Sequence, residues 1–137
     1  MEKVFENDFT TTYFDAEKAL IKNVWKEESA NLTEVSFKET LLQLKQVVLS
    51  HNTKKMMLDT RLFKFLIEPR LQEWVATNVT SLYARNGLQK VATILPSSIF
   101  ERVSLQQTVD ENLGGIQFQR AYFDDESSAR KWLLTNS

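Results

Sequence analysis

Asp59 and Thr60 are the side chains of this sequence best placed to do chemistry. They close the short apolar stretch 55–58, where a strand of an α/β sheet would end. Open α/β sheets bind ligands outside the carboxyl ends of their strands, so this pair could contact a ligand or act as a switch. Aspartate and threonine also commonly hydrogen-bond nearby backbone groups in loops. The sequence leaves both interpretations open.

Other reactive side chains lack the partners that catalysis or metal binding needs. His51 is the only histidine, and no residues at the spacing of a triad or a metal cluster accompany it. The acidic run 124–126 suits the start of a helix, where the helix dipole favours negative charge. There is no cysteine, which excludes disulfides and thiolate chemistry. We therefore predict a protein that is not an enzyme and uses no metal or cofactor.

The charge balance argues against nucleic acid as a partner. Seventeen basic and 18 acidic residues give a net charge of −1, and no basic run exceeds Lys54-Lys55. Binding to phosphate backbones would need a local basic patch. No apolar run approaches the roughly 20 residues of a membrane span. Because the first eight residues include acids where a signal peptide needs an apolar core, we expect a cytoplasmic location.

Local patterns predict the elements that would position these residues. Residues 9–14 are β-branched and aromatic, and together with 18–26 they predict a β-hairpin. Ser36-Phe37-Lys38-Glu39 has the spacing of a capping box and predicts a helix over 36–51. The short stretch 55–59 then predicts a buried central strand.

Helices and strands alternate through the rest of the chain. Pro69 suits the first position of a helix, and an apolar face continues to Arg85. Further segments are predicted as a strand at 91–95, a helix from 98 towards 112, a strand at 116–123 after Gly114-Gly115, and a helix from about 126. We thus expect one α/β domain over residues 1–137, with a mixed sheet of about five strands and about four helices.

This element order resembles the STAS domain, the fold of sulfate-transporter tails and anti-sigma-factor antagonists. It is most similar to the bacterial branch that is grouped with STAS and with CRAL-TRIO lipid-binding domains. Met56-Met57-Leu58-Asp59 resembles the central strand that ends in an acid, and residues 90–95 resemble the next strand. Residues 122–133 resemble the terminal pattern F-D-x-x-x-x-A-x-x-W-L. The resemblance spans about residues 12–134.

The resemblance implies a regulatory protein that works by docking to a partner. In the phospho-regulated antagonists, a kinase modifies a serine at the start of the helix after the central strand. Here the corresponding stretch, 65–70, has no serine or threonine, and Glu68 and Pro69 stand where the serines would be. Thr60 is the nearest hydroxyl. The resemblance to CRAL-TRIO domains implies, as an alternative, an apolar pocket for a small lipid-like ligand.

Residues 59–70 are the candidate binding segment. Its apolar side chains at 63 and 65–67 would form a partner surface or ligand entrance if exposed, or would fold back over the core. We interpret the chain as an interaction module that binds a protein partner or a second copy of itself. The predicted contact residues are Asp59, Thr60, Arg61, Phe63, Lys64, Phe65, Glu68 and Arg70.

Overall fold

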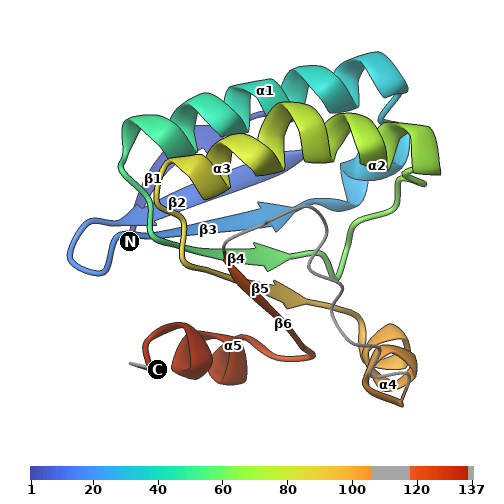
Figure 1. Cartoon of the computed structure of the whole chain (residues 1–137). Coiled ribbons are helices and arrows are strands. Elements are labelled where there is room, and N and C mark those ends of the chain that lie inside the picture. The colour runs from blue at the N-terminus through green and yellow to red at the C-terminus, as the bar shows by residue number, and fades with distance from the viewer. Residues whose placement is uncertain (106–117, 136–137) are drawn as a thin grey trace.

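The computed structural model describes residues 1–105 and 118–135 of the chain (Figure 1). Its centre is a six-stranded mixed sheet whose strands lie side by side in chain order. The strands are β1 (Glu2–Glu6), β2 (Thr10–Asp15), β3 (Leu20–Trp25), β4 (Lys55–Asp59), β5 (Lys90–Ile94) and β6 (Gln119–Phe123). The first three strands are antiparallel, and β3 to β6 are parallel. The predicted α/β class, mixed sheet and N-terminal hairpin are confirmed.

The sheet has one strand more than predicted, because β1 was missed. Only Val4 and Phe5 of this strand are partly buried, and its other three positions are all charged. An edge strand with so few apolar residues lacks the alternating pattern by which a strand is predicted from sequence. It pairs with β2 through a register irregularity between Lys3 and Phe5.

Helices cover both faces of the sheet (Figure 1). On one face lie α1 (Glu34–Ser50) and a helical run made of α2 (Pro69–Val75), a π-helical turn (Ala76–Thr80) and α3 (Ser81–Arg85). On the opposite face lies α5 (Glu126–Leu133), which follows β6 and contacts β4 and β5. A short 3-10 helix, η1 (Glu27–Asn31), connects β3 to α1, and α4 (Ser97–Leu105) follows β5.

Two apolar layers follow from the alternation of side chains along the central strands. Ile21 and Met56 are neighbours in the register and pack in the core beneath α1 and α3. Leu20 and Met57 point to the opposite face, where they pack with Leu133 of α5. Because β3 and β4 supply side chains to both layers, these strands hold the two sides of the molecule together.

The predicted helix starts need small corrections. The capping box of α1 is formed by Thr33 and Ser36, not by Ser36 and Glu39: the Thr33 hydroxyl accepts from the Ser36 amide at 3.1 Å. The helix therefore begins at Glu34. The strand predicted at 91–95 begins one residue earlier, at Lys90. The predicted helix end near residue 112, Gly114-Gly115 and the strand start at 116 lie outside the described residues.

Candidate functional site

Asp59 closes β4 and binds the residue two positions further along the chain. Its carboxylate accepts hydrogen bonds from the Arg61 amide at 3.1 Å, from Nε at 3.0 Å and from Nη2 at 2.7 Å. Asp59 is only 7% exposed. The carboxylate thus fixes the turn after the strand, as expected if Asp59 bonds local backbone and side-chain groups.

The charge of Asp59 is balanced within the protein. Burial works to raise the pKa of this carboxyl group, but the hydrogen bonds from the side chain and backbone of Arg61 outweigh burial, and the pKa lies below its ordinary value. The same pairing raises the pKa of Arg61. Asp59 therefore stays ionised at neutral pH, which suits an ion pair rather than proton transfer.

Thr60 is also engaged by the protein. Its hydroxyl donates to the Ile94 carbonyl at 2.7 Å, and its amide bonds the same carbonyl at 2.9 Å. These two bonds tie the loop after β4 to the end of β5. Asp59 and Thr60 therefore make the structural contacts that were one of the two open interpretations.

The aromatic side chains of the candidate segment fold back over the core. The Phe63 ring lies 4.8 Å from the Trp25 ring, and the Phe65 ring lies 5.1 Å from the Phe37 ring, measured between centroids. Ile67 packs against the same cluster. The predicted alternatives for these aromatics were exposure or burial, and the structure shows them half-buried against the core.

Ser29 binds the backbone of the candidate segment at Leu62 and Lys64. It belongs to η1, is fully buried, and its hydroxyl accepts from the Lys64 amide at 2.9 Å while donating to the Leu62 carbonyl at 3.3 Å. Its position in a short 3-10 helix gives no recognisable signal in the sequence. The segment thus has a fixed conformation set by one hydroxyl and a cluster of aromatic rings.

Alternate side chains of residues 62–68 are exposed to solvent. From 62 to 68 every even-numbered residue is exposed and every odd-numbered one is half-buried. Leu66 is 79% exposed and Leu62 is 46% exposed. Exposed leucines on a rigid backbone are the kind of feature that marks an interaction surface. The predicted contact residues omitted both of these leucines.

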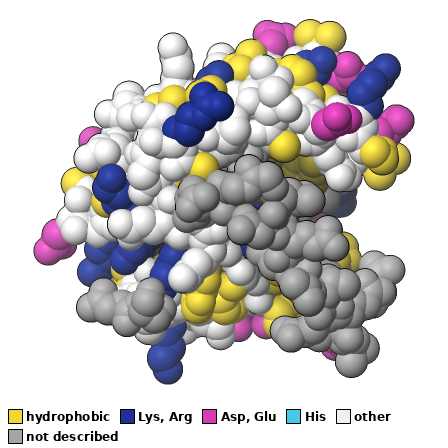
Figure 2. Space-filling model, in the orientation of Figure 1, with side chains coloured by type: hydrophobic (Ala, Val, Ile, Leu, Met, Phe, Trp, Pro, Cys, Tyr) yellow, Lys and Arg dark blue, Asp and Glu magenta, His cyan; other side chains and the backbone are white. Residues whose placement is uncertain are grey.

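Charged side chains surround these leucines. Arg70, at the start of α2, is 87% exposed on its side chain and lies 3.4 Å from Glu34 at the start of α1. Lys64 lies 3.9 Å from Glu27, and Glu68 precedes α2 without a hydrogen bond from its side chain to the helix start. Figure 2 shows hydrophobic, basic and acidic side chains side by side at the end of the molecule where α1 and α2 begin.

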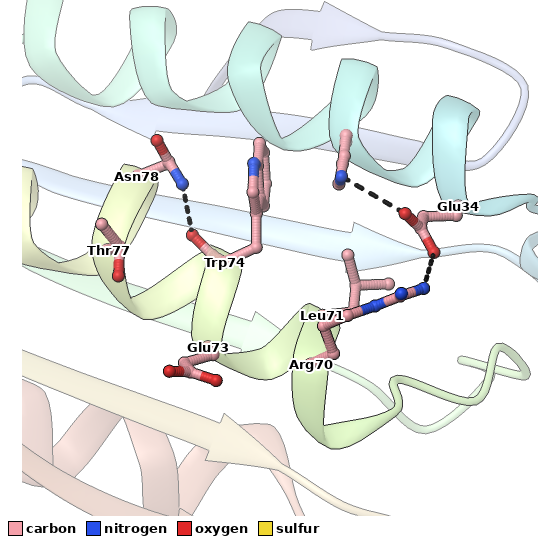
Figure 3. A pocket seen from close by; sticks show the side chains of 8 residues that line it. Glu34, Arg70, Leu71, Glu73, Trp74, Thr77 and Asn78 are labelled. Atoms are coloured by element: carbon pink, nitrogen blue, oxygen red, sulfur yellow. Dashed lines mark hydrogen bonds and ion pairs between the residues drawn. The ribbon is translucent and has the colours of Figure 1, made fainter.

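A groove runs from this surface between α1 and α2. It has a volume of about 490 Å³ and is lined by Glu34, Lys38, Arg70, Leu71, Glu73, Trp74, Thr77 and Asn78 (Figure 3). The Lys38 ammonium lies 5.3 Å from the centroid of the Trp74 ring and 3.3 Å from Glu34. In the π-helical turn, the Asn78 side chain donates to the Trp74 carbonyl at 2.9 Å, and the Asn78 carbonyl accepts from Lys45 of α1 at 3.2 Å.

The predicted contact residues thus form two groups. Asp59 and Arg61 lie towards α5, and the charges of Glu126 and Asp125 act on Arg61. The residues from Phe63 to Arg70 lie towards α1 and α2. We call the exposed face of Leu62, Lys64, Leu66 and Glu68, together with Arg70, the outer surface of the segment.

Comparison with protein-family models, with curated proteins and with solved structures finds no match to this chain. The similarity to STAS domains therefore stays a prediction from the sequence. Over residues 1–105 and 118–135, no three acidic or histidine side chains gather in an arrangement that could hold a metal ion. In the same ranges, every helix is too short or too polar to cross a bilayer.

Proposed function

We propose that this chain is a cytoplasmic regulatory module of the STAS type that works by protein–protein contact and without catalysis. Its binding site is the outer surface of the 62–68 segment with Arg70. The observation that carries the proposal is Leu66, which is 79% exposed on a segment whose neighbouring rings and backbone are fixed. A segment whose backbone is already held in place loses little conformational entropy on binding, so an exposed leucine on it is an effective anchor.

The contacts of the most reactive side chains favour binding over catalysis. Asp59 is held by Arg61, and the Thr60 hydroxyl is used by the Ile94 carbonyl. A general acid or base needs a group that is free to meet a substrate. Neither side chain offers one, whereas Lys64, Glu68 and Arg70 offer exposed charges around the leucines.

The alternative function, a carrier of a small apolar ligand, has less support. Phe63, Phe65 and Ile67 pack against the core cluster that includes Trp25 and Phe37. The groove between α1 and α2 is open and bordered by the charged side chains of Glu34 and Arg70. A lipid-like ligand would require an apolar lining.

Substitution of Leu66 tests the proposal directly. Leu66→Asp places a charge at the centre of the outer surface and should abolish cross-linking of the protein to its partner in cells. The matched control is Leu42→Asp, which changes an exposed leucine on α1 outside this surface. Quantitative mass spectrometry of the cross-linked species measures the loss. Equal retention of the partner by both variants would refute the proposed site.

A further inference from the structure

The segment from Phe63 to Glu68, which follows a turn at Arg61 and Leu62, resembles a strand that pairs with none of the described strands. Its side chains alternate between the core and solvent as in a β-strand. It is nevertheless outside the six paired strands. An extended segment with one face packed and one edge unpaired is the element that β-strand addition uses.

The unpaired edge can be identified from the hydrogen bonds that are already made. Along an extended chain, the backbone groups of alternate residues point to opposite edges. The Lys64 amide donates to the Ser29 hydroxyl, so the even-numbered residues of the extended part face η1. Phe65 and Ile67 consequently face the other edge. Among the described residues, no hydrogen bond is made to the amide or carbonyl of Phe65, and the Ile67 carbonyl accepts only from the Gln72 side chain.

The exposed charges of this segment complement each other in one arrangement. If the segment pairs antiparallel with its own copy around Leu66, then Lys64 of each chain stands opposite Glu68 of the other. Leu66 stands opposite its own counterpart. Cross-strand pairs of opposite charge and of apolar side chains both stabilise a sheet, and like charges in those positions destabilise it.

We propose that two copies of this chain associate by antiparallel pairing of residues 64–68 across a two-fold axis at Leu66. The inference rests on the proposed function and names the partner at that site as a second copy. Phe65 and Ile67 of opposite chains exchange the backbone hydrogen bonds, and Leu66 forms the close, non-hydrogen-bonded pair. A net charge of −1 per chain leaves little long-range repulsion between the copies.

A charge-swap experiment tests this pairing. Lys64→Glu gives each chain acidic side chains at both 64 and 68, and Glu68→Lys gives it basic side chains at both. Each variant alone should dimerise roughly tenfold or more weakly than the wild type, because two attractive pairs become repulsive. An equimolar mixture of the two should recover the wild-type dimer affinity, since every cross-strand pair is then of opposite charge. Sedimentation equilibrium measures the affinities.

Native mass spectrometry of the mixture, with one variant isotopically labelled, should show heterodimers in excess over both homodimers. Lys64 and Glu68 are exposed, so both variants should fold, and thermal melting checks that they do. Leu66→Asp should abolish the dimer, and Leu42→Asp should leave it intact. A monomeric wild type, unaffected variants, or a mixture that stays monomeric would each overturn the dimer. A monomer that still loses its cellular partner only with Leu66→Asp would refute the dimer and leave the proposed function standing.

Discussion

At the scale of single residues, Asp59 and Thr60 look reactive but make structural contacts. Ser29, which the sequence does not single out, positions the segment with the exposed leucines. Asp59 and Thr60 hold the turn after β4 through Arg61 and the Ile94 carbonyl. Ser29 holds the segment that carries the exposed leucines, with one hydroxyl that both accepts and donates. A buried hydroxyl that satisfies two backbone groups is costly to remove, because both groups are left unpaired away from water.

Replacement of Ser29 should therefore destabilise the protein and loosen the segment. We expect Ser29→Ala to lower the free energy of unfolding by about 1–3 kcal/mol. Urea denaturation measures this loss, and hydrogen exchange at the Lys64 amide should accelerate more than exchange in β4. Ser50→Ala is the control, because that hydroxyl is exposed and bonds only at the C-terminal end of α1. Equal effects of the two substitutions would contradict the role given to Ser29.

At the scale of elements, α5 is a short helix that depends on one buried cation. It has eight residues, too few to be stable alone in water. Lys90 at the start of β5 is 6% exposed, and its ammonium donates to the Trp132 carbonyl at 3.0 Å and to the Thr135 carbonyl at 2.9 Å. A positive charge at a helix C-terminus satisfies its free carbonyls and favours the helix dipole.

Without the Lys90 ammonium, we expect α5 to unfold locally before the rest of the protein unfolds. Lys90→Met keeps much of the apolar stem but removes the charged donor, so we expect a loss of about 1.5–3 kcal/mol in unfolding free energy. The Trp132 ring, which lies 4.9 Å from the ammonium, should report the change in its fluorescence. Lys131→Met on the exposed side of α5 is the control. Hydrogen exchange in α5 that is unchanged by Lys90→Met would contradict this account.

The elements also show which parts of the structure the sequence could predict. The hairpin and the central strands were predictable because their β-branched and apolar residues differ clearly from their flanks. The α1 start was not, since Thr33-x-x-Ser36 overlaps Ser36-x-x-Glu39 and only the first forms the cap. The π-helical turn has no sequence signal. Between 62 and 67 nearly every residue is apolar, so the sequence cannot tell Phe65, which is packed, from Leu66, which is exposed.

At the scale of the whole molecule, ion pairs of Glu6 stabilise the N-terminal strands, and the pair between Lys22 and Glu126 connects the sheet to α5. Glu6 of β1 lies 2.8 Å from Lys26 and 2.9 Å from Lys3. Hydrogen bonds from these two lysines, that from Lys26 first, lower the pKa of Glu6 from 4.5 to about 2. Glu126 of α5 lies 2.8 Å from Lys22 of β3, and the hydrogen bond from Lys22 lowers the pKa of Glu126.

These lowered pKa values make the fold sensitive to acid. A carboxyl group whose pKa is lower in the folded state stabilises the protein above its unfolded pKa, and that contribution is lost as pH falls towards the folded pKa. For Glu6 this window runs from about 4.5 down to about 2. Urea unfolding should therefore show a steady stability at neutral pH and a decline below about 4.5. Because Glu6→Gln cannot titrate, its stability should decline less steeply, and 1 M salt, at which the Debye length is about 3 Å, should shrink the difference between the two proteins. Parallel pH profiles for the wild type and Glu6→Gln would show that the pairing of Glu6 with Lys3 and Lys26 does not contribute to the acid response.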